Sequence, residues 1–145
     1  FGAALGGATA VQLDQLAAFA SPIGRAFQFR DDLLGVFGDQ QLTGKPAGDD
    51  LREGKRTVLV AHALAKASAA ASAELESMLG NEALDAAQVD RAREIIVTSG
   101  ARDAVENTIE AGDAQAMDAL SKADVTEEGR VALGNLATAS VRRAF

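Results

Sequence analysis

The sequence has 145 residues, with 14 Lys or Arg against 21 Asp or Glu, and a formal net charge of −7. It contains no Cys, which excludes disulfides and thiolate metal sites and favours an intracellular, cytoplasmic protein. Net negative charge argues against nucleic acid as a partner, because phosphate backbones require stripes of Lys and Arg. Charged residues interrupt every apolar stretch before it reaches the roughly 18–20 residues of a membrane span, so none is expected.

Strong helix formers dominate the first forty residues, with apolar residues at helical spacing. Thr9 and Gln12 have the spacing of a capping box and predict a helix that begins near Ala10. Gly38 predicts its end, and Pro22 predicts either a kink or a break between two helices. The residues expected to form its apolar side are Val11, Leu13, Leu16, Phe19, Ile23, Phe27, Leu34 and Phe37.

Residues 38–54 contain four glycines, one proline and no apolar period, which predicts a long loop. A helical pattern resumes near Arg56 and runs past Ala70, although residues 67–73 are rich in Ala and Ser and suggest a frayed helix or a connector. Three further helices are predicted over about 86–98 (after a cap at Asp85), 101–122 and 127–143. The predicted fold class is therefore all-α.

Acidic residues gather at the end of the first predicted helix. Gln28, Asp31 or Asp32, and Asp39 are three, four or seven residues apart, so they can point toward one cavity. Carboxylate oxygens are the ligands that Mg²⁺ prefers, and Mg²⁺ often completes its shell with substrate phosphates. Taken alone, the pair Asp31–Asp32 is also compatible with two solvated carboxylates on a helix surface.

The loop that follows carries Lys45 and Lys55 among glycines. Lysine acts on phosphate as a compact point charge, and glycines let a loop close over an anionic ligand. The alternative is a charged, solvated loop that binds no anion. A P-loop is excluded, because both its spacing and its preceding apolar strand are missing.

Together the two segments resemble a known family. Phe27-Gln28-x-x-Asp31-Asp32-Leu33-Leu34-x-x-Phe37-Gly38-Asp39, followed by Gly44-Lys45-x-x-Gly48-x-Asp50-x-x-x-Gly54-Lys55-x-Thr57, is similar to the second aspartate-rich region of trans-prenyl diphosphate synthases. That family includes farnesyl, geranylgeranyl and polyprenyl diphosphate synthases. The match covers about thirty contiguous residues in type, order and spacing.

The resemblance implies an all-α isoprenoid synthase bundle and a Mg²⁺-dependent prenyltransferase. In that family an allylic prenyl diphosphate ionises, the carbocation alkylates isopentenyl diphosphate, and a proton is lost. Cations must stabilise the departing diphosphate, and water must be excluded because it would trap the carbocation.

The resemblance also implies roles for individual residues. Asp31 would be a direct Mg²⁺ ligand, and Asp32 a ligand or a water-mediated partner. The residues implied to contact substrate are Lys45, Lys55 and Gln28 for the allylic diphosphate, and Phe27 for the prenyl chain unless it packs in the core. Asp39 and Asp50 would support this set.

Two departures from the family pattern stand out. Gly35 occupies the position of the family's third acid, and we expect the loss to be tolerable because a water-mediated position is less costly to lose than a direct ligand. The family's first aspartate-rich motif is absent from residues 1–145. We therefore expect the C-terminal part of a single prenyl synthase domain, inactive alone, from an enzyme that the resemblance implies to be a homodimer.

Two alternatives remain at this point. One is a class I terpene cyclase, which ionises a prenyl diphosphate without condensation; the Gly-Lys loop argues against it, because cyclases carry a different motif there. The other is a non-catalytic subunit of a prenyl synthase. A non-catalytic role is disfavoured because the residues implied to bind metal and diphosphate are all present, namely Asp31, Asp32, Lys45 and Lys55. The residues that set product chain length in the family lie near the first aspartate-rich motif, which residues 1–145 do not contain.

Overall fold

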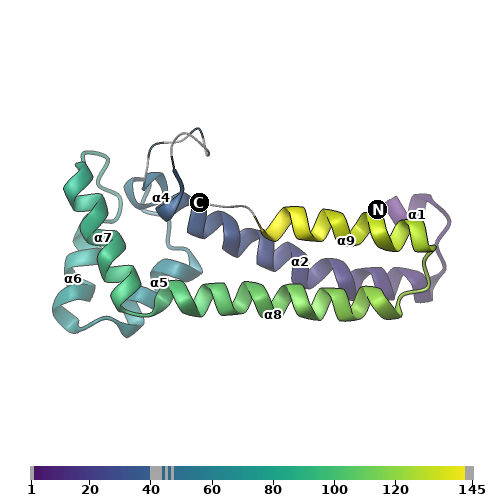
Figure 1. The fold of residues 1–145 in the computed structure, drawn as a ribbon. Helices are drawn as coiled ribbons and strands as arrows, with labels where there is room; N and C mark the ends of the chain where they lie inside the picture. The colour runs from purple at the N-terminus through teal and green to yellow at the C-terminus, as the bar shows by residue number, and fades with distance from the viewer. Residues whose placement is uncertain (1, 40–43, 45, 47, 143–145) are drawn as a thin grey trace. The chain divides into compact units, whose positions relative to one another are not determined.

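Helices make up all the regular structure that the computed structural model describes, namely residues 2–39, 44, 46 and 48–142. In chain order (Figure 1) they are α1 (Gly2–Leu5), α2 (Ala10–Phe37), α4 (Asp49–Arg52), α5 (Val58–Lys66), α6 (Ala69–Met78), α7 (Ala86–Thr98), α8 (Ala101–Lys122) and α9 (Glu127–Val141). The all-α prediction is confirmed. Within these ranges no helix is long and apolar enough to cross a membrane. The cytoplasmic location stays a prediction.

Helix α2 begins with the predicted capping box. The Thr9 amide donates to Gln12 Oε1 (3.0 Å), and the Gln12 amide donates to Thr9 Oγ1 (3.2 Å). The helix then continues for 28 residues through Pro22, so the alternative of a break at this proline is wrong. Pro22 is buried, and its carbonyl oxygen would lie 3.3 Å from a Cβ placed on Gly112 of α8. This packing offsets the hydrogen bond that proline cannot make.

Two segments are more ordered than the sequence predicts. The loop expected over residues 38–54 contains the helical turn α4. The connector expected over residues 67–73 shrinks to two residues, because the Ser68 hydroxyl accepts a hydrogen bond from the Ala71 amide (3.3 Å) and starts α6 there. The predicted caps elsewhere are confirmed, including a full capping box between Asp85 and Gln88 at the start of α7.

The chain divides into two compact units, which are described separately. The first comprises residues 1–28 and 108–143. Its buried core consists of Phe19, Ala116, Leu120 and Ala137, packed against Ile23, Ala119, Val125 and Leu133. The predicted apolar side of α2 is partly wrong here, since Val11 is 64% exposed and Leu13 is 37% exposed.

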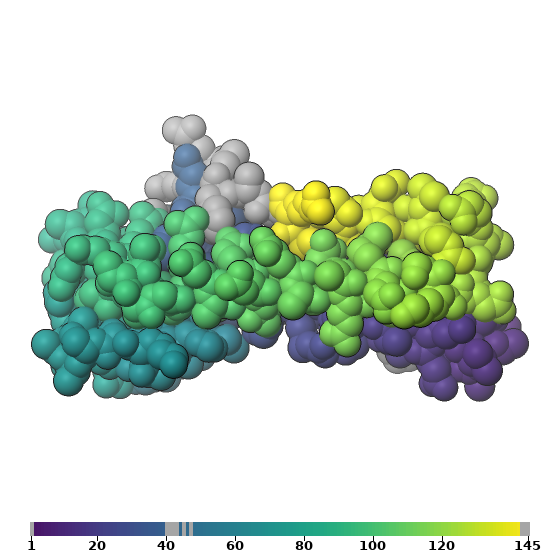
Figure 2. Space-filling view, turned by 60° about the horizontal axis from the view of Figure 1, so that its bottom comes forward, coloured from purple at the N-terminus to yellow at the C-terminus, as the bar shows by residue number. Residues whose placement is uncertain are grey.

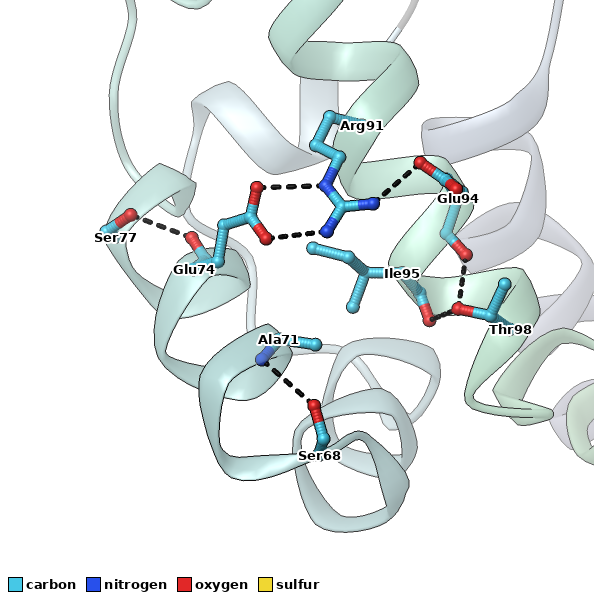
Figure 3. A network of polar contacts seen from close by, with 8 residues as sticks. All are labelled: Ser68, Ala71, Glu74, Ser77, Arg91, Glu94, Ile95 and Thr98. Atoms are coloured by element: carbon cyan, nitrogen blue, oxygen red, sulfur yellow. Dashed lines mark hydrogen bonds and ion pairs between the residues drawn. The ribbon is translucent and has the colours of Figure 1, made fainter.

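The second unit comprises residues 29–107, and it contains the motif residues from Asp31 to Lys55. Helices α5, α6 and α7 pack against one another, and α5 and α6 contribute the teal part of the surface in Figure 2. Arg91 of α7 makes a two-pronged contact with Glu74 of α6 (2.9 and 2.8 Å) and also reaches Glu94 (2.7 Å), as Figure 3 shows. The hydrogen bonds from Arg91 lower the pKa of Glu74.

Three contacts hold the acidic end of α2 within this unit. Arg30 donates to both carboxylate oxygens of Glu106 (2.8 and 2.7 Å). The Arg93 guanidinium donates to the Val36 carbonyl oxygen (2.7 Å) at the last turn of the helix. The Arg102 guanidinium lies 5.0 Å from the centre of the Phe37 ring, within cation–π range.

The Arg30–Glu106 pair should contribute measurably to stability, because its side chains are only 11% and 27% exposed. We expect Glu106→Ala to lower the free energy of unfolding by about 1–3 kcal/mol, since the largely buried Arg30 guanidinium loses two hydrogen bonds to a carboxylate. Asp118→Ala is the matched control, because the Lys122–Asp118 pair is mostly exposed, and it should cost less than about 0.5 kcal/mol. Urea unfolding of both variants measures the difference, and equal losses would contradict a special role for Arg30–Glu106.

Candidate functional site

The paired acids lie on the last three turns of α2. Asp32 is 7% exposed, and Asp31 is half-buried. Leu33 and Val36, which follow the acid pair, are fully buried and fix the rotation of the helix in the second unit. The acids are thus held by the packing of their neighbours rather than carried on a free surface.

The lysine-bearing segment folds as a tight turn around the buried side chain of Leu51. Gly48 adopts a left-handed conformation (φ 72°) and precedes α4, whose Leu51 is fully buried. Burying a leucine contributes roughly 2–3 kcal/mol, enough to organise so short a helix. The Leu51 carbonyl oxygen accepts from the Gly54 amide (3.1 Å) and from the Gly80 amide (2.9 Å), and the second bond ties the turn to the segment after α6.

Glycines permit this close packing at both ends of the turn. A Cβ on Gly48 would lie 2.7 Å from Val89 Cγ1, and a Cβ on Gly54 would lie 3.0 Å from the Gly80 Cα. Both glycines have positive φ, which side chains rarely adopt. Gly48 and Gly54, two of the glycines predicted to let a loop close over a ligand, therefore have a structural role, because they allow neighbouring segments of the chain to approach closely.

Lys55 lies at the end of this turn and faces acids. Its ammonium group lies 2.5 Å from Asp50 Oδ1 and 2.7 Å from Glu53 Oε2. The hydrogen bond that Lys55 donates to Asp50, and to a smaller extent the one that it donates to Glu53, raise the pKa of Lys55 well above the ordinary lysine value, although burial opposes them. Lys55 is therefore a fully charged ammonium at neutral pH, and a third N–H remains beyond the two used here.

Asp50 connects the turn to the acidic helix. It is 8% exposed, and a Cβ built on Gly35 of α2 would collide with its carboxylate, with Oδ1 at 2.9 Å and the other two atoms closer still. Gly35 follows Asp31 by four residues and Asp32 by three, so all three share one face of α2 at roughly 5–6 Å between Cβ positions. This contact brings the Asp50 carboxylate against α2 about one turn from the acid pair, and the joint role of Asp31, Asp32 and Lys55 stays a prediction.

The remaining predicted residues are placed as follows. Asp39 is exposed just beyond α2. Phe27 is 39% exposed and Gln28 is exposed, and both belong to the first unit, so their relation to Asp31 rests only on their spacing along one helix. Lys45 lies outside the described residues.

Sequence reasoning missed a second group of acids. Asp49, Asp50 and Glu53 bring carboxylate oxygens within 4.8 Å of one another, the one such group found among the described residues. Its spacing within a single helical turn could have indicated it. The Lys55 ammonium already contacts two of the three acids, so the group is an ion-pair network with its own cation.

A hollow of about 330 Å³ lies in the first unit, between α8 and α9. Met117, Leu120, Val131 and Gly134 give it a mainly apolar lining. It contains no residue of the aspartate- and lysine-bearing motif, so it is not part of the candidate site.

Comparison with known proteins identifies a consistent set of relatives. The sequence model of the family described as "Polyprenyl synthetase" matches residues 1–96. The geranylfarnesyl diphosphate synthase of Aeropyrum pernix is 42% identical over 113 residues, which are 78% of this chain and 34% of that protein. The geranylgeranyl diphosphate synthase of Mycobacterium tuberculosis is 34% identical over 128 residues, 86% of this chain and 37% of that protein.

Solved structures give the same result. A geranylgeranyl pyrophosphate synthase from Corynebacterium glutamicum, complexed with isoprenyl diphosphate and magnesium, matches with a TM-score of 0.93 and 40% identity over 99% of this chain and 41% of that chain. A polyprenyl synthase from Caulobacter crescentus, complexed with calcium and isoprenyl diphosphate, matches with a TM-score of 0.80 and 34% identity, covering 95% of this chain and 42% of that one. The chain thus spans well under half the length of these relatives.

The packing at Gly48 can be tested against a glycine of the same conformation. Gly48→Ala should lower the free energy of unfolding by about 2–4 kcal/mol, because the clash with Val89 adds to the cost of a left-handed alanine. Gly44→Ala is the control: its φ is 71° and a Cβ there meets nothing within 4 Å, so only the backbone cost of about 1–2 kcal/mol applies. Denaturant unfolding of the two variants compares them, and similar losses would rule out the Val89 contact as the cause.

The origin of the raised Lys55 pKa is testable with Asp50→Asn, in which the pKa of Lys55 should fall toward the ordinary lysine value. Because the folded-state pKa is raised, the ion pair stabilises the fold below the unfolded-state pKa of about 10.4. That contribution disappears as the pH rises through the higher folded-state value. Titration of the Lys55 Cε and Nζ resonances by NMR measures the change in pKa. An unchanged Lys55 titration in Asp50→Asn would show that the raised pKa does not arise from Asp50.

Proposed function

Because the chain belongs to the polyprenyl synthetase family, we propose that it supplies the diphosphate-binding part of a prenyltransferase that joins an allylic prenyl diphosphate to isopentenyl diphosphate. Its predicted isoprenoid synthase fold is confirmed by the structural matches. The contact between the Asp50 carboxylate and Gly35, one turn from Asp31 and Asp32, is the observation that carries the proposal.

The donor set fits a hard divalent cation. Asp31 and Asp32 offer carboxylate oxygens from adjacent positions, and Asp50 brings a third carboxylate to the same helix face. In this proposal Asp31 and Asp32 hold Mg²⁺ together with the diphosphate oxygens. When bound, Mg²⁺ would neutralise charge that develops on the departing diphosphate. The relatives solved with magnesium or calcium and isoprenyl diphosphate support a divalent cation in this role.

The chain's cations would bind the substrate's diphosphate. Lys55 is fully charged and pre-positioned by Asp50 and Glu53, so its remaining N–H can donate to a phosphate oxygen without a search for the right rotamer. Lys45 and Gln28 complete the proposed diphosphate set, with Asp39 as a supporting carboxylate. Phe27, which is 39% exposed, would contact the prenyl chain in this proposal.

This assignment is favoured over the alternatives. The named relatives are prenyl diphosphate synthases rather than cyclases. A non-catalytic subunit would have no need of the arrangement in which two buried acids and a paired ammonium converge, because buried carboxylates are costly to maintain. Homodimerisation of the full-length enzyme stays a prediction.

The metal assignment is tested by calorimetry on the 145-residue chain with a non-hydrolysable allylic prenyl diphosphate analogue. We expect binding that requires Mg²⁺, and a loss of at least about tenfold in affinity for Asp31→Ala, because a direct ligand is removed. Asp14→Ala, on the exposed part of the same helix, is the control and should bind as wild type does. Equal affinity in wild type and Asp31→Ala would remove the metal assignment.

A further inference from the structure

Gly35 stands where the family's aspartate-rich motif has a third acid, and the structure gives a steric reason for glycine at this position. A side chain at position 35 would occupy the volume that the Asp50 carboxylate fills. Position 35 is helical with ordinary backbone geometry, so the glycine is not required by φ. The need for glycine here arises from space alone.

Asp50 cannot easily move aside. Its neighbour Leu51 is fully buried, and the Arg52 guanidinium donates to the Leu84 carbonyl oxygen (3.0 Å). Gly48 and Gly54 are in close contact with Val89 and Gly80 on either side of α4. The turn is therefore restrained from several directions while the Asp50 carboxylate lies against α2 at Gly35.

The two oxygens of Asp50 face different partners. Oδ1 accepts from the Lys55 ammonium (2.5 Å), while Oδ2 lies nearest the space above Gly35. The Asp50 side chain, taken without its backbone, is only 11% exposed. Its carboxylate therefore needs a cation to offset the cost of desolvation, and the Lys55 ammonium supplies this charge. A side chain at 35 would push the carboxylate off the helix and carry Lys55 with it.

We propose that Asp50 is a positioning residue, which uses the space left by Gly35 to hold the Lys55 ammonium beside the acidic face of α2. The missing third acid of the α2 motif is then offset by a carboxylate supplied from the neighbouring turn. This inference rests on the proposed diphosphate function of the site, but its central contact can be measured without any ligand.

The test exchanges the two positions. Gly35→Ala should displace Asp50, lower the pKa of Lys55, and weaken Mg²⁺-dependent binding of inorganic pyrophosphate by about tenfold or more. Asp50→Ala should do the same by removing the carboxylate. The exchange variant Gly35→Asp with Asp50→Ala returns a carboxylate to nearly the same space, so it should regain the raised Lys55 pKa and affinity within about threefold of wild type.

Gly24→Ala is the matched control, because it adds a Cβ to the same helix where nothing lies within 4 Å. It should leave both readouts unchanged, and circular dichroism melting identifies any variant that fails to fold. A wild-type Lys55 titration in Gly35→Ala, or an exchange variant as weak as Asp50→Ala, would overturn the proposal. The Lys55 titration needs no ligand, so it can support the positioning role even if Asp31→Ala leaves diphosphate binding intact and the proposed function fails.

Discussion

The ion pair between Asp50 and Lys55 is the interaction on which the candidate site depends. Both partners come from one short turn, yet their position is set by α2, because the carboxylate needs the space above Gly35. Alone, a carboxylate with so little solvent would be costly, and a flexible lysine would sample many rotamers. When the two are paired, the ammonium offsets the negative charge of Asp50, and the hydrogen bond holds the Lys55 side chain in one orientation. In the proposed function, this pairing would hold the lysine in place before substrate binds.

Contacts outside the motif maintain this arrangement. Arg30 of α2 pairs with Glu106 of α8, and Arg93 of α7 and Arg102 of α8 contact the Val36 carbonyl oxygen and the Phe37 ring of α2. These contacts restrain rotation of the helix end that carries the acids. The pairing of Arg91 with Glu74 joins α7 to α6. Two residues after α6, the Gly80 amide donates a hydrogen bond to the Leu51 carbonyl oxygen of the lysine-bearing turn. Electrostatic preorganisation requires this kind of rigid support, because donors that must reorganise lose much of their effect.

Local signals in the sequence predicted most of the helices. Capping residues such as Thr9 and Asp85 act within one turn of their helix, so their effect can be read from spacing alone. The errors fell where distant packing decides. Pro22 stays within a helix because α8 approaches it at Gly112, and residues 49–52 become helical because Leu51 is buried by remote parts of the second unit. For the site, the motif predicts that Asp31, Asp32 and Lys55 act together, and this stays a prediction. The reason for Gly35 lies in its contact with Asp50, fifteen positions away, which no periodicity encodes.

The back-to-back approach of Gly54 and Gly80 has a consequence for how this region can vary. With one end of the turn held at Val89 and the other at Gly80, the chain between them has no spare length. Inserting one residue would rotate everything beyond it by about 100° and shift it by about 1.5 Å along the local helix axis. The lysine would then face solvent while every individual side chain remained intact. In this segment the number of residues between Gly48 and Gly54 therefore constrains the fold as directly as the identity of any side chain does.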